Sequence, residues 1–353
     1  MRPRMPFPHL PRVSGPRGPL RAATNPRDAR LRHASRLILG REGSIRRPVG
    51  FLIIAAVIAT IITPSFIRPA NLNALLVGSS FLAVVAVGEA FVVMVGSIDL
   101  GVESLLASFG MAVAWLTVFH AVPTGLAILI TLFGSIVVGL IVGALVAKVH
   151  IPSFVVTLGT YWGFRGIALL TNGGAYISPA SRNTAQTSFG FAGVAGSTGG
   201  ISNLIIIAVG IVIVGQCILS FTRLGLWLKS IGSNELAARR VGLRADWLKM
   251  SVFAISALLA ACAGIMITAW QGSIYPNTGE GYSLEAIAAV ILGGIPFTGG
   301  RGSIVGAAIG ALILGIINDL IVLLGLPALY EYIFVAIVLI VAGLQARSDA
   351  LVK

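Results

Sequence analysis

Charged side chains inside long apolar segments are the first candidates for chemistry in this sequence. Six of them interrupt such segments: Glu89, Asp99, Glu103, Arg165, Glu285 and Asp319. A charge in the centre of a bilayer costs about 2.5–3.5 kcal/mol on insertion scales, so each position requires an explanation. Asp99, Glu103 and Glu285 are near enough to segment ends to be hydrated there. Glu89 lies about 9 Å inside its segment along a helix, so we expect it to face a polar cavity or a partner.

Residues that commonly catalyse reactions are not arranged for catalysis here. A phosphate-binding P-loop needs a glycine before its lysine, whereas the lysines of this chain follow Ala147, Leu228, Leu248 and Val352. The histidines are His9, His33, His120 and His150. They lie near the N-terminus or at segment ends, so they supply neither a clustered metal site nor a serine–histidine pair. We therefore expect no catalytic residues, no metal site and no cofactor.

A third candidate is the polar segment 232–242, which has the pattern of a short helix. Ser233 or Asn234 is a suitable N-cap, and Gly242 is a suitable C-terminal stop. Four residues at helical spacing share one face: Glu235, Ala238, Arg239 and Gly242. Small residues allow close approach and the charges set orientation, so this face is predicted to dock in a groove of another protein. A solvated amphipathic loop helix is the alternative.

The elements that position these residues must be membrane helices. The 353 residues are 56% hydrophobic and only 10% charged, with mean hydropathy +0.96. This composition predicts an all-α polytopic membrane protein of about ten spans and excludes an additional soluble catalytic domain. Proline, glycine and charged clusters delimit the predicted spans, which are 50–67, 71–95, 102–120, 124–147, 152–171, 202–222, 250–270, 283–298, 303–324 and 327–345.

Basic residues predict the orientation of these spans. The net charge is +13, but 12 of the 25 lysines and arginines are arginines before residue 48, so we interpret the charge as topology and expect no nucleic-acid partner. With a cytoplasmic N-terminus, 22 basic residues are inside and two, Arg68 and Arg182, outside. The positive-inside rule thus predicts two cytoplasmic termini. The predicted parts are a disordered basic tail (1–48), a membrane domain (49–345) and a C-terminal tail (346–353).

Two loops and one internal similarity complete the pattern. Residues 172–201 are rich in Gly, Ser and Thr and suit an extracytoplasmic face, whereas the basic loop 223–249 suits a cytoplasmic docking site. Residues 95–100 weakly resemble residues 292–297, which is typical of repeats with broken helices in transporters, although chance similarity of Gly-containing apolar strings explains it equally well.

Several segments within residues 50–345 resemble the ribose-type permeases of ATP-binding cassette (ABC) transporters, which share a superfamily with branched-chain amino acid permeases. The matching segments are 96–100, 151–159, Arg165-Gly166, 234–242 (Asn234-Glu235, Ala237-Ala238-Arg239 and Gly242), 281–294 and 299–306. Two positions depart from the family pattern, because Ser97 replaces a usual glycine and Glu103 replaces a usual small residue.

The resemblance implies a ten-helix importer subunit in a bacterial inner membrane. Its implied partners are a second permease copy or homologue, ABC ATPase subunits, a solute-binding protein and the membrane lipid, with a monosaccharide as the expected solute. The 235–242 segment corresponds to the helix that couples to the ATPase. Residues predicted along the solute path are Glu89, Asp99, Arg165, Glu285 and Asp319. The alternatives are a secondary transporter using Glu89 or Asp99 as a proton or ion site, and an intramembrane enzyme, for which no nucleophile pattern exists.

Overall fold

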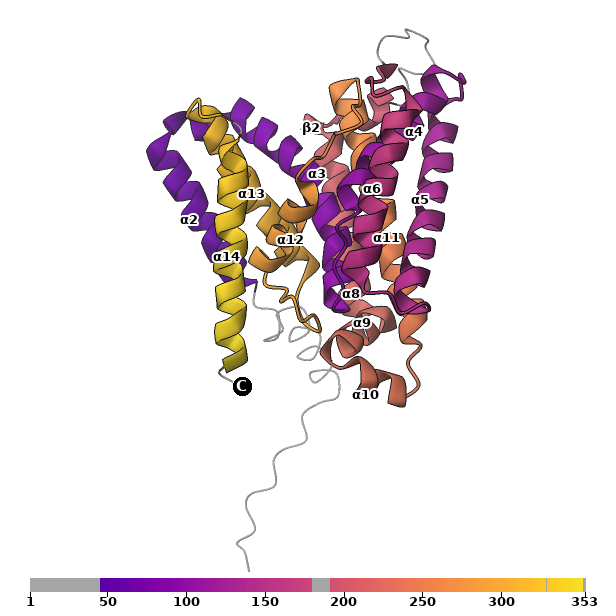
Figure 1. Cartoon of the computed structure of the whole chain (residues 1–353). Coiled ribbons are helices and arrows are strands. Elements are labelled where there is room, and N and C mark those ends of the chain that lie inside the picture. The colour runs from indigo at the N-terminus through magenta and orange to yellow at the C-terminus, as the bar shows by residue number, and fades with distance from the viewer. Residues whose placement is uncertain (1–44, 180–190, 328, 352–353) are drawn as a thin grey trace, which may run out of the picture. The chain divides into compact units, whose positions relative to one another are not determined.

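A helix lies in each of the ten segments predicted as spans (Figure 1). The computed structural model describes residues 45–179, 191–327 and 329–351, so most of the predicted tail 1–48 lies outside the described residues. The ten helices are α2 (Arg46–Ile62), α3 (Pro69–Met94), α4 (Val102–Val118), α5 (Thr124–Ala147), α6 (Ser153–Thr171), α8 (Asn203–Phe221), α11 (Ala245–Gln271), α12 (Tyr282–Leu292), α13 (Ile304–Leu323) and α14 (Tyr330–Leu351).

Six of these helices are long and apolar enough to cross a membrane: α3, α5, α6, α8, α11 and α13. Helices α4 and α12 and the first half of α14 are also apolar but shorter. This pattern confirms the predicted all-α polytopic membrane fold. A small hairpin pairs β1 (Ser197–Thr198) with β2 (Ile201–Ser202), and a 3-10 helix, η1 (Pro64–Ile67), connects α2 to α3.

Prolines and serines mark several helix starts. Pro69 occupies the first turn of α3, where its missing N–H leaves no bond unmade. Pro152 directly precedes α6. The Ser303 hydroxyl accepts the Gly306 N–H and caps α13. These local signals explain why the starts of these helices lie within about two residues of the predicted ones.

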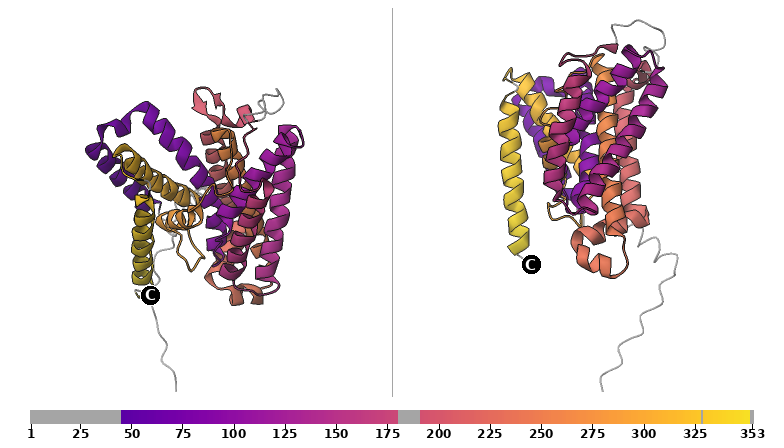
Figure 2. Two further views of the ribbon diagram at one scale, coloured as in Figure 1. Left: turned by 45° about the horizontal axis from the view of Figure 1, so that its top comes forward. Right: turned by 45° about the vertical axis from the view of Figure 1, so that its right-hand side comes forward.

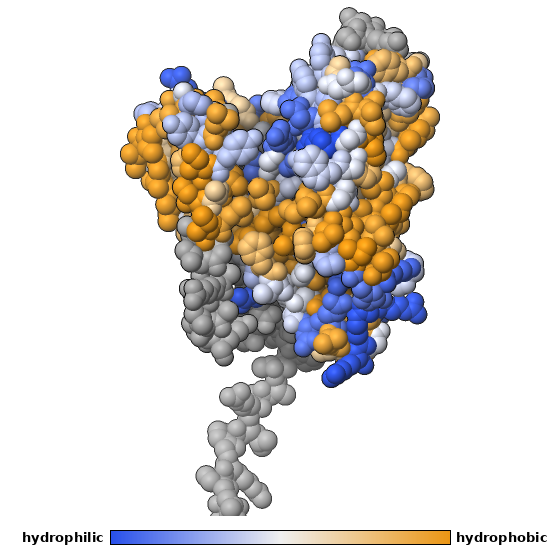
Figure 3. Space-filling model, in the orientation of Figure 1, coloured by the Kyte–Doolittle hydropathy of each residue, from blue (hydrophilic) through white to orange (hydrophobic). Residues whose placement is uncertain are grey.

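Helices α3 and α11 form the centre of the fold. The most apolar stretch of α3 is 89% buried and that of α11 is 78% buried, whereas those of α5, α6 and α8 are only 22–28% buried. Helix α3 packs on α8, α11, α12 and α13, and α11 also packs on α4 and α5. Figure 2 shows α2 and α14 at one edge of this group and α5 at the other. The apolar outer faces leave a broad hydrophobic band in Figure 3.

Small residues allow the central helices to approach closely. A Cβ atom added at Gly143 of α5 would lie 2.6 Å from the Met250 Cα atom of α11, closer than real atoms come. A Cβ atom at Gly264 of α11 would lie 2.3 Å from the Leu106 carbonyl oxygen of α4. Membrane helices associate largely through such close packing, because lipid supplies no hydrophobic driving force between them.

Helix α12 corrects one predicted span. It has 11 residues, from Tyr282 to Leu292, and therefore rises about 17 Å, roughly half of a 30 Å hydrocarbon core. The prediction of a continuous span over 283–298 was wrong because Gly294 adopts φ +89°, which ends the helix. Two other bounds also differ: α11 begins at Ala245, and α14 extends to Leu351, into the predicted C-terminal tail.

The basic loop 223–249 contains two short helices, α9 (Arg223–Ser233) and α10 (Glu235–Arg240). Both short helices lie at the end of the helix bundle where α14 finishes (Figure 1). Hydrophilic residues gather over α9 and α10 in Figure 3, beyond the apolar band. The loop thus presents a polar surface at one end of the membrane helices.

Candidate functional site

A buried ion pair joins α4 to α6. The Arg165 Nη2 atom lies 3.1 Å from Glu103 Oε1, and Arg165 Nη1 donates to the Pro276 carbonyl oxygen at 2.6 Å. Arg165 is 9% exposed and Glu103 is 5% exposed. The Tyr161 ring lies 5.6 Å from the guanidinium carbon, which adds a cation–π contact. Glu103 is therefore a paired interior group, and the alternative that it is hydrated at a helix end is wrong.

The second oxygen of Glu103 holds the start of the half-length helix α12. Glu103 Oε2 accepts the N–H groups of Gly281 at 3.0 Å and Ser283 at 3.3 Å. The first N–H groups of a helix have no partner within that helix, and its N-terminal end attracts negative charge. Ser283 Oγ donates to the Leu100 carbonyl oxygen at 3.0 Å. One carboxylate therefore connects α4, α6 and α12.

A second buried group lies where α3 breaks before α4. The Asp99 N–H donates to Glu89 Oε1 at 3.2 Å, and Ser256 Oγ of α11 donates to Asp99 Oδ2 at 2.9 Å. Asp99 Oδ1 accepts the Gly101 N–H, which forms a turn at the start of α4. Glu89 is 0% exposed and Asp99 is 2% exposed. One oxygen of Glu89 therefore has a partner within the chain, whereas its Oε2 atom is buried without a hydrogen-bond partner among the described residues.

The remaining predicted path residues lie on the other side of α3. Glu285 of α12 is 5% exposed and its carboxyl group lies against Glu331 of α14. Glu331 also accepts a hydrogen bond from Asn318 of α13. Asp319 accepts from Asn71 Nδ2 at 2.7 Å, which ties α13 to the start of α3. Thus Glu89 contacts Asp99, Glu285 lies near Glu103 of the Arg165 ion pair, and Asp319 belongs to a separate contact.

An ionic network fastens α10 to α11. Glu235 Oε1 accepts from Arg239 Nη2 at 2.9 Å, and Glu235 Oε2 accepts from Lys249 Nζ at 2.7 Å. Arg239 also pairs with Asp246. Partial burial raises the pKa of Glu235, but hydrogen bonds from Lys249 and Arg239 outweigh this and lower it overall. Hydrogen bonds to Asp246 and Glu235 raise the pKa of Arg239. Both groups are therefore charged at neutral pH.

The predicted docking face of α10 is turned toward its own chain. Asn234 Oδ1 accepts the Ala237 N–H and is the N-cap, and Gly242 adopts φ +87° after the helix, as a stop residue should. Ala238 is only 4% exposed. The outward side chains are instead Leu236, 72% exposed, and Val241, 78% exposed. The sequence-based docking face did not include these two residues, although exposed apolar side chains in a basic loop can mark an interaction site.

The end of α9 contacts both helix breaks. A Cβ atom added at Gly232 would lie 1.8 Å from the Met94 carbonyl oxygen and 2.4 Å from the Gly300 nitrogen. The Gly300 N–H donates to the Met94 carbonyl oxygen at 2.9 Å. The C-terminal end of α3 and the loop that follows α12 therefore meet beside the end of α9. The end of α9 is thus packed directly against the end of the membrane helix α3 and against the loop that follows α12.

No group of three histidine, cysteine, aspartate or glutamate side chains in the described residues is arranged to hold a metal ion. The polar contacts above instead connect helices. Their chemistry is that of charged and hydroxyl groups at helix breaks, which is where transporters bind polar solutes.

Comparisons with known proteins agree with this architecture. The ribose import permease of Escherichia coli strain K12 is 35% identical over 296 residues, covering 84% of this chain and 91% of the relative. That of Bacillus subtilis strain 168 is 36% identical over 299 residues, covering 85% and 91%. An L-arabinose ABC transporter permease of Azospirillum brasilense is 32% identical over 318 residues, covering 90% of each chain. No solved structure matches the chain.

A family model provides the broader match. The model described as "Branched-chain amino acid transport system / permease component" matches residues 71–343, which include every helix from α4 to α13 and most of α3 and α14. This match confirms the predicted class, a multi-pass permease subunit rather than an enzyme. The chain belongs to the branched-chain amino acid transport system permease family.

Proposed function

We propose that this chain is the membrane subunit of an ABC importer that moves a monosaccharide into the cytoplasm. The observation that carries the proposal is its similarity, over 84–90% of its length, to permeases named for ribose and L-arabinose import. A separate ATPase hydrolyses ATP, and a separate binding protein delivers the sugar. Both termini and the loop 223–249 face the cytoplasm, as the excess of basic residues there requires.

The solute path runs beside the half-length helix α12. Glu103, Arg165 and Glu285 offer charged acceptors and donors near its first turns. Sugars carry many hydroxyl groups, and carboxylates and guanidinium groups bind hydroxyls through charge-assisted hydrogen bonds. Discontinuous helices commonly bind solutes near the middle of the membrane in transporters. Glu89 and Asp99 act differently: they stabilise the turn between α3 and α4 and thereby shape the path.

The ATPase binds the outward face of α10. Leu236 and Val241 are the exposed apolar residues of this short helix, and Arg240 lies between them in sequence and is also exposed. Exposed apolar side chains flanked by a charge are typical of interface centres. Glu235 and Arg239 contribute by fastening α10 to α11, so a force applied to α10 moves both. The contact of Gly232 with Met94 and Gly300 carries this movement to the helix breaks.

The second membrane subunit packs against this one through an outer helix face. Helices α5, α6 and α8 leave most of their apolar residues exposed, and lipid or a second permease copy covers them. The coupling route from α10 through α9 to the helix breaks is the same whether the second subunit is an identical copy or a homologue.

Transport in proteoliposomes tests this function. The chain is reconstituted with its ATPase, and the uptake of radiolabelled ribose or arabinose into the proteoliposomes is measured. The binding protein is added outside the vesicles, and ATP is enclosed inside them, on the side of the ATPase. Uptake should require ATP and the binding protein, and should stop when the P-loop lysine of the ATPase is replaced. Uptake driven by a proton gradient, without any ATPase, would identify a secondary transporter and overturn the proposal.

A further inference from the structure

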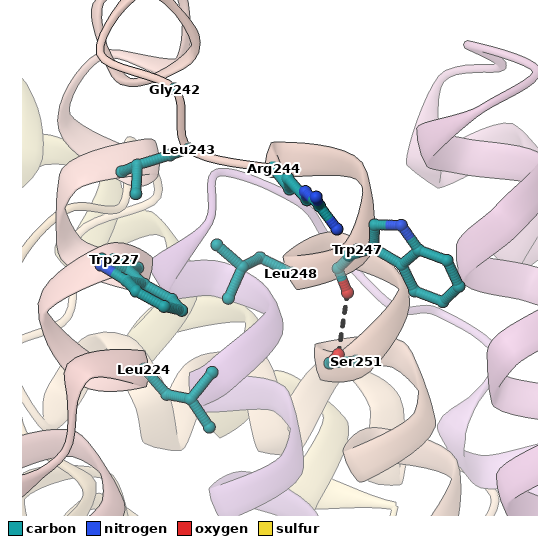
Figure 4. A pocket seen from close by; sticks show the side chains of 8 residues that line it. All are labelled: Leu224, Trp227, Gly242, Leu243, Arg244, Trp247, Leu248 and Ser251. Atoms are coloured by element: carbon teal, nitrogen blue, oxygen red, sulfur yellow. Dashed lines mark hydrogen bonds between the residues drawn. The ribbon is translucent and has the colours of Figure 1, made fainter.

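A pocket of about 390 Å³ opens between α9 and the first turns of α11 (Figure 4). Its walls are Leu224 and Trp227 from α9, Leu243 from the connection, and Trp247 and Leu248 from α11. The volume is in the range of small-ligand sites, about 300–1,000 Å³. None of the residues of the buried ion pair or of the carboxylates at the helix break lines this pocket. It is therefore separate from the proposed solute path.

The pocket has an apolar interior and a cationic rim. The Arg244 side chain reaches over it in Figure 4, and Lys148 Nζ lies 4.9 Å from the centre of the Trp247 ring. Neither cation has an ion-pair partner among the described residues. The nearest carboxylate along α11, that of Asp246, is held by Arg239 and so does not neutralise Arg244. The rim is therefore electropositive while the walls are hydrophobic.

The pocket lies along the first turns of α11, where this apolar helix follows the basic loop that contains α9 and α10. Ser251, at its floor, lies six residues after the start of α11, or about 9 Å along the helix. Interfacial helices bury their apolar faces about 5–10 Å into this boundary. Helix α9 has the same character, because Leu226 is 66% exposed and Leu224 is 42% exposed while Arg223 and Lys229 are close in sequence. Tryptophan is also enriched at this depth.

We propose that this pocket binds an anionic phospholipid, with an acyl chain between Trp227 and Trp247 and the headgroup phosphate on Arg244 and Lys148. A bound lipid wedged between α9 and α11 would set the position of α9 and, through Gly232, of the helix breaks. Lipid binding at this pocket is independent of the solute that the permease carries.

Brominated lipids provide the test, because bromine atoms on an acyl chain quench a tryptophan that they contact. The purified full-length permease is placed in phosphatidylcholine nanodiscs with increasing amounts of brominated phosphatidylglycerol. We expect a saturable quenching component that brominated phosphatidylcholine does not reproduce. Replacing both pocket tryptophans, Trp227→Phe and Trp247→Phe, should remove this component and leave the quenching of Trp115, Trp162 and Trp270.

Two substitutions separate headgroup from acyl-chain binding. Arg244→Gln should weaken the saturable component about five-fold, since each basic residue near an anionic surface contributes an attraction of this size. Arg240→Gln is the matched control, because Arg240 is exposed on α10 but does not line the pocket. Ser251→Phe should fill the floor and abolish binding while leaving the charge unchanged. Ser251 is exposed, so this change does not disturb the core.

Three outcomes would overturn the proposal. The first is equal quenching by brominated phosphatidylglycerol and brominated phosphatidylcholine. The second is an equal effect of Arg244→Gln and Arg240→Gln on the quenching. The third is normal lipid quenching in Arg244→Gln together with loss of ATPase binding, which would identify the pocket as a binding site for the ATPase.

Discussion

The Glu103 carboxylate connects three helices through its two oxygens. One oxygen pairs with Arg165 of α6, and the other accepts two N–H groups at the start of α12. Both charged residues are buried, so each depends on the other to offset the loss of hydration. In this chain, an ion pair defines where the half-length helix begins.

Removing one partner of this pair should destabilise the permease strongly. Arg165→Met leaves Glu103 buried and unpaired, which typically costs about 3–5 kcal/mol. The midpoint of thermal unfolding in detergent should fall clearly. The double variant Arg165→Met with Glu103→Gln should recover part of the loss, because the isolated charge is gone. An unfolding midpoint for the double variant equal to or below that of Arg165→Met would show that the pair is not coupled in this way.

Helix α10 has two faces with separate tasks. Glu235 and Arg239 bind Lys249 and Asp246 of α11, and Ala238 is buried beneath them. The opposite face exposes Leu236 and Val241. A helix of six residues has little stability by itself, so its ion pairs with α11 hold it in place.

A charge on the outward face of α10 should therefore impair assembly with the ATPase. Leu236→Glu and Val241→Glu should each weaken the binding of the ATPase about ten-fold or more, because each would bury an unpaired carboxylate in the interface. Co-purification and the ATPase activity stimulated by loaded binding protein measure the effect. Val149→Glu is the control, because Val149 is 60% exposed but lies in the turn between α5 and α6. If Val149→Glu loses ATPase binding while Leu236→Glu and Val241→Glu keep it, the ATPase binds the turn between α5 and α6 instead.

At the scale of the whole permease, the arrangement of the helices explains which of them are buried and places the loop with α9 and α10 at one end. The central helices α3 and α11 are surrounded by others, and the apolar sides of α5, α6 and α8 face outward. The loop containing α9 and α10 lies at the end where α14 finishes (Figure 1). The basic residues concentrated at this end predict that it faces the cytoplasm.

Labelling of introduced cysteines tests this orientation. In a chain with Cys217→Ala and Cys262→Ala, an impermeant thiol reagent added to spheroplasts should modify Ser197→Cys and not Ala237→Cys. Ser197 lies in β1 after the membrane helix α6, and Ala237 lies in α10 at the opposite end; both are exposed. Permeabilised cells are the control, because there both positions should react. Modification of Ala237→Cys in intact spheroplasts would invert the proposed topology.

Local properties of the sequence determined the class of this protein and the number of its membrane segments. Hydropathy depends on runs of neighbouring residues, so the ten helices and the short helix after Asn234 could be predicted without knowing their contacts. The resemblance to ribose-type permeases rested likewise on contiguous segments. Prolines and N-caps placed several helix starts, because their effects act within one turn.

Only the tertiary structure decided which charges meet and how long α12 is. Arg165 and Glu103 are 62 residues apart, and the two N–H groups that Glu103 binds are about three times as far along the chain. No local pattern encodes such a pairing, since it results from how α4, α6 and α12 cross. The same holds for α10: spacing showed that Glu235 and Ala238 share a face, but the position of α11 decided that this face is turned inward.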